Sequence, residues 1–179
     1  MTGKPPPGPA GASATLGALG AAALAIATCA LVPALAQDKA PDRSQDAAWH
    51  NAQQAALASL QPADGWGTLP GGLRIRRVAG DGTGPHPTVE DTVTVHYAGK
   101  LTDGTTFDSS WDRGEPATFP LGKLIPAWKL AIPQMGVGDT IEIAVPADLG
   151  YGPGGKGPIP GNATLLFTIE LLAIGDGKG

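Results

Sequence analysis

Cysteine and histidine are scarce in this chain, and their scarcity excludes several kinds of chemistry. One cysteine, Cys29, stands among 179 residues, so no intrachain disulfide framework can form. The three histidines have no metal-ligand spacing, and no serine, histidine and aspartate pattern suggests a hydrolase. The sequence therefore predicts neither a metal nor a cofactor.

The chain also lacks an excess of positive charge. Its 12 basic residues stand against 16 acidic residues, for a formal net charge of −4, and no basic stripe is visible. Nucleic-acid-binding domains usually carry such a stripe, so the sequence argues against a nucleic-acid partner. Glycine (27) and proline (18) are plentiful but follow no regular period, which indicates turns and tails.

Large aromatic side chains are few: four tryptophans, three phenylalanines and two tyrosines. One of them ends the run Leu124-Ile-Pro-Ala-Trp128. Proline suits the first turn of a helix, so a short helix is predicted from Pro126. A proline within a helix removes a hydrogen bond, at a cost of ~3 kcal/mol, so Pro133 predicts that this helix ends near Ile132. Trp128 at its head is either core filling or the floor of a binding site.

The N-terminal segment has the organisation of an export signal. Lys4 precedes a stretch without charge from Pro5 to Gln37, and an apolar run extends from Leu16 to Val32. The run closes with Pro33-Ala-Leu-Ala36, an A-x-A cleavage pattern. We expect residues 1–36 to be a signal peptide, so that the protein is periplasmic or secreted. The alternative is an uncleaved membrane anchor, because the run is longer than an ordinary signal core.

Residues 37–72 are predicted to form a polar segment, a short helix and a linker. Ser44 is the expected N-cap of a helix that extends to about Leu60, with Asp46 in its first turn. The side chains on its apolar face are Trp49, Ala52, Ala56 and Leu60. Such a narrow face packs either on the main domain or on a second subunit, in a homodimer formed through residues 44–60. Residues 61–72, rich in proline and glycine, are the expected linker.

From Leu73 onward the pattern becomes an alternation of apolar and polar residues, which is typical of strands. Strands are predicted over residues 73–78, 92–97, 105–107, 139–145 and 164–172, the first of them at an edge of the sheet. Strands joined by turns, with one short helix between them, predict an α+β fold with an antiparallel sheet. The domain is expected to span residues 73–174, followed by a tail over 175–179.

Seven short motifs follow one another within this domain. They are Val95–Gly99, Asp103–Ser110, Leu121-Gly122, Leu124–Trp128, Met135–Gly138, Leu149–Gly152 and Ile159–Leu165. On these motifs the chain resembles the FK506-binding protein (FKBP) family of peptidyl-prolyl cis–trans isomerases. The resemblance implies a curved antiparallel sheet wrapped around one short α-helix. It also implies rotation about X–Pro bonds of polypeptide clients, and inhibition by the macrolides FK506 and rapamycin.

The resemblance further implies a prolyl pocket between the helix and the sheet. Trp128 is the expected floor, and the expected substrate-binding residues around it are Tyr97, Phe107, Leu124, Ile159 and Phe167. The expected catalytic groups are the carboxylate of Asp108 at the rim, the hydroxyl of Tyr151 and the backbone N–H of Ile125.

Several positions outside this set bear on the pocket. Phe119 is expected to be core beneath the pocket, and Asp112-Arg113 a charge pair that either lies at the surface or orders a loop. Ala117 stands where many family members have an aromatic wall residue, and Ala127 replaces the usual glycine before the tryptophan. With Pro158 beside Ile159, these departures keep an alternative open: an FKBP-fold chaperone or binding module with weak or no isomerase activity.

Overall fold

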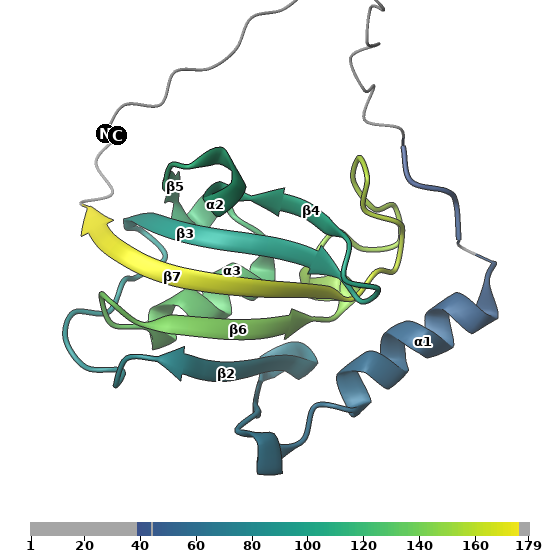
Figure 1. Cartoon of the computed structure of the whole chain (residues 1–179), viewed down its shortest axis with the longest axis horizontal. Coiled ribbons are helices and arrows are strands. Elements are labelled where there is room, and N and C mark those ends of the chain that lie inside the picture. Colours follow the sequence, from purple (N-terminus) through teal and green to yellow (C-terminus); the bar gives the residue numbers. More distant parts are fainter. Residues whose placement is uncertain (1–38, 44, 176–179) are drawn as a thin grey trace, which may run out of the picture. The chain divides into compact units, whose positions relative to one another are not determined.

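The computed structural model describes residues 39–43 and 45–175. Its main feature is an antiparallel sheet in the order β1-β2-β6-β7-β3-β4, with β5 paired to β3 beside β4. The strands are β1 (Gly67–Leu69), β2 (Leu73–Ala79), β3 (Thr92–Leu101), β4 (Thr106–Ser109), β5 (Ala117–Pro120), β6 (Thr140–Val145) and β7 (Leu165–Gly175). Figure 1 shows the long strand β7 between β3 and β6.

One face of this sheet packs on a short helix, α3 (Pro126–Ala131), seen behind the strands in Figure 1. Side chains on β3 alternate between buried and half-buried positions, as expected for a strand with one face on the core. The fully buried side chains common to this core include Val93, Val95, Ile132, Met135, Ile141, Ile143, Leu165, Ile169 and Leu171. The predicted α+β fold, an antiparallel sheet around a short helix, is confirmed.

Two prolines set the limits of α3. Pro126 occupies its first turn, where the missing N–H costs no hydrogen bond. The α-helix ends at Ala131, and Pro133 lies in the 3-10 helix η4 (Ile132–Gln134) that follows. The tighter turn accommodates Pro133, which would break an α-helical hydrogen bond at this point. The predicted short helix that ends near Ile132 is confirmed.

The segment expected as a linker contributes to the sheet. It contains η1 (Pro62–Asp64), β1 and η2 (Pro70–Gly72), and β1 pairs with the first residues of β2. Consequently β2 lies between β1 and β6 along Leu73–Ile75 rather than at an open edge. Three residues are too few to show an alternating pattern, so the sequence alone gave no sign of β1.

The helix before the domain, α1 (Ala47–Ala58), is N-capped by Asp46, whose side chain accepts a hydrogen bond from the Trp49 N–H. Ser44, the expected cap, lies outside the described residues. Of the expected face, Trp49 and Leu60 are partly buried against the core, whereas Ala52 is exposed. The most buried positions of α1 are Gln53 and Leu57, which the predicted face did not include. Leu57 packs with Trp66 and Ala144. This contact packs α1 on its own domain. A homodimer formed through residues 44–60 stays a prediction.

Three further short helices complete the described elements: α2 (Ser110–Arg113) directly after β4, η3 (Leu121–Lys123) before α3, and η5 (Ala147–Leu149) after β6. No helix within residues 39–43 and 45–175 has the length and apolar character to cross a membrane. The predicted signal segment and most of the predicted tail lie outside the described residues.

Candidate functional site

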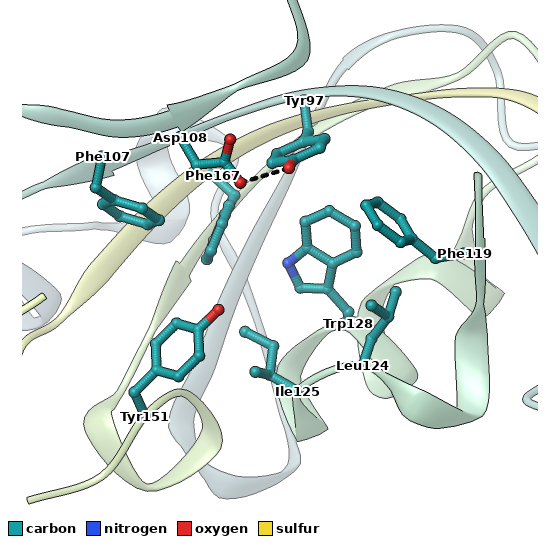
Figure 2. Close-up of a pocket in the computed structure, with 9 residues that line it drawn as sticks. All are labelled: Tyr97, Phe107, Asp108, Phe119, Leu124, Ile125, Trp128, Tyr151 and Phe167. Carbon is teal, nitrogen blue, oxygen red and sulfur yellow. Dashed lines mark hydrogen bonds between the residues drawn. The ribbon is translucent and has the colours of Figure 1, made fainter. Parts of the chain in front are cut away.

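A mainly apolar cavity of about 190 Å³ opens between α3 and the sheet. Its lining comes from β3, β4, β5, β7, α3 with the two residues before it, and the loop after β6. Figure 2 shows these nine residues: Tyr97, Phe107, Asp108, Phe119, Leu124, Ile125, Trp128, Tyr151 and Phe167. Segments distant in the sequence therefore supply one compact pocket.

Trp128 forms the floor, and rings surround it edge-on. Its ring centroid lies 5.3 Å from that of Tyr97, 5.5 Å from Phe167 and 6.3 Å from Phe119, at interplanar angles of 81°, 86° and 78°. Such T-shaped contacts are favourable because a positive ring edge meets a negative ring face. The indole is 4% exposed, and its Nε1–H has no hydrogen-bond partner in the described structure. The pocket floor is thus fixed by packing alone.

Gly99 allows the walls to approach the strand behind them. A Cβ atom at this position would lie 2.5 Å from Cζ of Phe107 and 2.8 Å from Cε1 of Phe167. These two rings meet at 5.6 Å and 87°, and they pack directly over the backbone of β3. The Ala98-Gly99 dipeptide of the sequence motif therefore has a steric reason, which is that a side chain would displace both walls.

The polar rim is a connected group on the sheet side of the pocket. The Tyr97 hydroxyl donates to Oδ2 of Asp108 at 2.5 Å, the contact dashed in Figure 2. Arg113 forms an ion pair with the other carboxylate oxygen of Asp108 and donates from Nη2 to the Tyr97 hydroxyl at 3.1 Å. The guanidinium also lies 5.6 Å from the centroid of the Tyr97 ring. Both oxygens of Asp108 are therefore held in a fixed orientation.

Burial and the hydrogen bond to Asp108 raise the pKa of Tyr97, and these effects outweigh the opposing influence of Arg113. Arg113 donates hydrogen bonds to Tyr97 and Asp108, and these bonds raise the pKa of Arg113. At neutral pH Tyr97 is therefore a neutral phenol and Arg113 a charged guanidinium.

A buried serine connects this rim to the sheet. Ser110 accepts from the Tyr97 N–H at 2.7 Å and donates to the Tyr97 carbonyl at 3.2 Å. Ser109 caps α2 by accepting from the Asp112 N–H, so the chain turns immediately after Asp108. The motif Asp108-Ser-Ser110 thus places a carboxylate, a helix cap and a link to β3 in consecutive residues.

Tyr151 closes the pocket from the loop opposite the rim (Figure 2). Its hydroxyl has no hydrogen-bond partner within the described residues, so it is available to a bound molecule. Burial, followed by the negative charge of Asp108, raises the pKa of Tyr151, which keeps the hydroxyl protonated as a donor at neutral pH. Ile125 lies near the base of the pocket, and its carbonyl accepts hydrogen bonds from the N–H groups of Trp128 and Lys129. Its own N–H has no acceptor in the described structure.

The structure brings eight of the nine predicted site residues together. Ile159 lines an adjoining cavity instead, which shares Phe107, Asp108 and Tyr151 with the pocket. The prediction for Phe119 was wrong, because its ring lines the pocket rather than lying beneath it. Arg113, expected as a surface charge, is the ion-pair partner of Asp108. The chemical roles of these residues stay predictions.

A metal site finds no support in this part of the chain. Within residues 39–43 and 45–175, no three histidine, cysteine, aspartate or glutamate side chains gather closely enough to hold a metal ion. The carboxylate of the pocket is already engaged by Tyr97 and Arg113. Besides the unpaired indole N–H of its floor, the site offers an apolar cavity with two free hydrogen-bond donors, the Tyr151 hydroxyl and the Ile125 N–H, and one oriented carboxylate.

Comparison with known proteins agrees with this geometry. The family model of the FKBP-type peptidyl-prolyl cis-trans isomerases matches residues 84–172. A peptidyl-prolyl cis-trans isomerase of Schizosaccharomyces pombe is 46% identical over 107 residues, which cover 58% of this chain and 96% of that relative. The chain belongs to the FKBP family.

Other FKBP relatives are longer. The FKBP-type isomerase FkpA of Aeromonas hydrophila is 49% identical over 118 residues, which cover 66% of this chain but 44% of that relative. This chain thus spans less than half the length of that protein. A crystal structure of a peptidyl-prolyl cis-trans isomerase from Pseudomonas syringae superimposes with a TM-score of 0.66 at 32% identity, covering 72% of this chain and 94% of the other. The FKBP resemblance seen in the sequence is confirmed.

Proposed function

We propose that this FKBP is a peptidyl-prolyl cis–trans isomerase that assists the folding of exported proteins. The observation that carries this proposal is the pocket itself: aromatic rings around a tryptophan floor, with donors at two sides and a fixed carboxylate at a third. A prolyl ring is compact and apolar, and its binding on Trp128 leaves the preceding amide between Asp108 and the free donors.

The chemistry of the reaction suits an apolar pocket. Resonance in the amide gives rotation a barrier of ~18–20 kcal/mol, and the uncatalysed X–Pro change takes tens to hundreds of seconds. The twisted amide has lost this resonance and carries less charge separation than the planar one. An environment poor in water therefore favours the twisted transition state over the planar ground state. No acid, base or nucleophile is required.

In this mechanism each polar group holds the substrate. The Tyr151 hydroxyl and the Ile125 N–H donate to substrate carbonyls on either side of the bond that rotates. These contacts fix the flanking chain while the prolyl ring is held by Trp128. Asp108 directs negative charge toward the carbon of the twisting carbonyl, and Arg113 and Tyr97 keep that carboxylate oriented.

The same pocket supports binding of FK506 and rapamycin, which the family resemblance implies. A protease-coupled assay with a proline-containing peptide tests the proposal. We expect turnover that FK506 inhibits. Chaperone activity without turnover would favour the alternative, an FKBP-fold binding module, for which Ala117 is the relevant feature because it supplies no aromatic wall to the pocket.

The export part of the proposal rests on the predicted signal over residues 1–36. Cleavage after Ala36 would leave Gln37 as the first residue and would remove Cys29 and Lys4. Mass spectrometry of the protein recovered from its native host checks this, and we expect a mass that begins at Gln37. A mass that includes residues 1–36 would instead support the uncleaved anchor.

A further inference from the structure

The loop between β6 and β7 carries Tyr151 and Ile159 to the site, and it is internally bonded. The Asn162 N–H donates to the Gly152 carbonyl at 2.9 Å. Lys156 and Ile159 exchange backbone hydrogen bonds in both directions, at 3.0 and 2.9 Å. These bonds join the two sides of residues 150–164 to each other. Gly150 and Gly152, on either side of Tyr151, also donate to the Ala147 carbonyl. The two sides of the loop are therefore coupled, so a contact that holds the side with Ile159 also restrains the side with Tyr151.

The segment before the domain contacts this loop at three points, two of them at glycine carbonyls. The Ala40 N–H donates to the Gly157 carbonyl at 2.9 Å. Nε1 of Trp49, in the first turn of α1, donates to the Gly161 carbonyl at 3.3 Å. Both acceptors lie in the half of the loop that contains Ile159. Neither contact touches the pocket, so both act on the substrate site only through the loop.

Gln53 makes the third and most buried contact, and its side chain is 2% exposed. Its Oε1 accepts from the Thr164 N–H at 2.9 Å, and its own carbonyl accepts from the Thr164 hydroxyl at 3.2 Å. Its Nε2 donates to the Thr102 hydroxyl at 3.2 Å, in the turn after β3. A buried amide is stabilising only when it is bonded in this way. Gln53 thus ties the end of the loop to α1 and to β3.

We propose that Ala40, Trp49 and Gln53 form a clamp that positions the loop over residues 150–164 at the pocket, and that Gln53 is its positioning residue. This inference rests on the proposed isomerase function. The Tyr151 hydroxyl has no partner of its own, so its position depends on how the loop is held. Release of the clamp weakens binding of the ground-state substrate and of the twisted amide equally, because the Tyr151 hydroxyl donates to both. We therefore expect KM to rise while kcat stays nearly unchanged.

The test compares Gln53→Ala with Gln54→Ala, its exposed neighbour on the same helix, in the full chain. Hydrogen exchange of the Ile159 and Asn162 amides reports the loop directly. We expect Gln53→Ala to speed their exchange about tenfold, as the loss of buried hydrogen bonds allows. We expect KM for a proline peptide to rise about three- to tenfold, with kcat changed less than twofold. Gln54→Ala should change neither quantity.

Two further variants separate positioning from general stability. Trp49→Phe keeps an aromatic side chain but removes the N–H that donates to Gly161. We expect faster loop exchange and a higher KM, each changed less than in Gln53→Ala. Ile174→Ala shortens a half-buried side chain at the far end of β7, and we expect lower stability without a change in KM or loop exchange. Equal loop exchange in Gln53→Ala and Gln54→Ala would overturn the clamp, as would an equal rise in KM for Ile174→Ala. If the wild-type chain shows no turnover, the isomerase proposal fails, and the exchange comparison alone decides the clamp.

Discussion

Asp108 is the acceptor around which the polar rim is arranged. One oxygen receives the Tyr97 hydroxyl and the other pairs with Arg113, so the carboxylate cannot turn away from the pocket. Ser110 holds the backbone of Tyr97 and fixes the distance between β3 and the start of α2. A charge that is oriented before the substrate arrives needs no reorganisation during the reaction.

This arrangement predicts unequal effects for the two polar groups that face the substrate. Tyr151→Phe removes one hydrogen bond to a carbonyl, so kcat/KM should fall about fivefold. Asp108→Ala also leaves the Tyr97 hydroxyl without its acceptor and Arg113 without its ion-pair partner, so the fall should be larger, about ten- to a hundredfold. The peptide assay measures both, and thermal unfolding checks that each variant is folded. Full activity in both variants would mean that the rim has been assigned wrongly.

Gly99 predicts a steric effect at the aromatic wall beside this rim, formed by Phe107 and Phe167. In Gly99→Ala the new Cβ would lie within 2.8 Å of both Phe107 and Phe167, so the rings must move into the pocket or the strand must shift. Overpacking of this kind costs about 1–3 kcal/mol of unfolding free energy, and substrate affinity should fall with it. Gly67→Ala is the matched control, because its Cβ would make an ordinary 3.7 Å contact with Ile75. Urea unfolding and KM distinguish the two.

The sequence reveals some residues of the site more readily than others. Tyr97, Trp128 and Tyr151 stand in motifs that combine scarce aromatics with glycine or proline, and all three line the pocket. Phe119 follows no such motif, and its side chain reaches the pocket because β5 pairs with β3 at Val93. In the sequence, nothing distinguishes Arg113 from other surface charges. Its pairing with Asp108 depends on the turn of the chain through α2. A contact made through tertiary pairing leaves no local signal.

The elements show the same division between local and tertiary causes. Pro126 and Pro133 act on their own neighbours, so the limits of α3 follow from chain chemistry alone. The inner face of α1 depends instead on its partner, because Thr164 and Thr102 lie where a buried glutamine can bond them. The apolar pattern predicts Trp49 and Leu60, which do pack on the core, but it gives no sign of the buried Gln53.

The start of α1 gives a prediction at the level of the helix. Asp46 accepts from the Trp49 N–H at 2.9 Å, so Asp46→Ala leaves that donor without its cap. We expect a loss of about 1 kcal/mol in unfolding free energy, measured by urea denaturation. Asp46→Asn should restore most of it, because asparagine caps a helix equally well. If asparagine and alanine behave alike, the cap contributes nothing at this end of α1.

At the scale of the whole molecule, the fold of the domain is set by strands whose pattern is visible in the sequence. The order in which the strands pair cannot be derived from this pattern. β3 pairs with three other strands, and one of them, β7, is distant from it in the sequence. Those pairings bury β3 and β7 on one face and bring Tyr97 next to Trp128. Alternation predicts the strands, and the family resemblance supplies the arrangement that alternation leaves open.

The two tyrosines of the chain, Tyr97 and Tyr151, make the state of the pocket measurable in the whole protein. Burial raises the pKa of each above its ordinary value of 10.0. The unfolded chain therefore loses these protons first as the pH rises, so unfolding free energy should hold steady up to about pH 10 and fall above it. Ultraviolet titration of the folded protein should show both phenols ionising with midpoints above 10.0, and Tyr151→Phe should leave a single transition from Tyr97. Any alkaline loss of turnover that comes from Tyr151 should likewise have its midpoint above 10.0, since Tyr151 donates only while protonated. A tyrosine that ionises at its ordinary pKa in the folded protein would show that its ring is not buried in the pocket, and the assignment of that hydroxyl would fail with it.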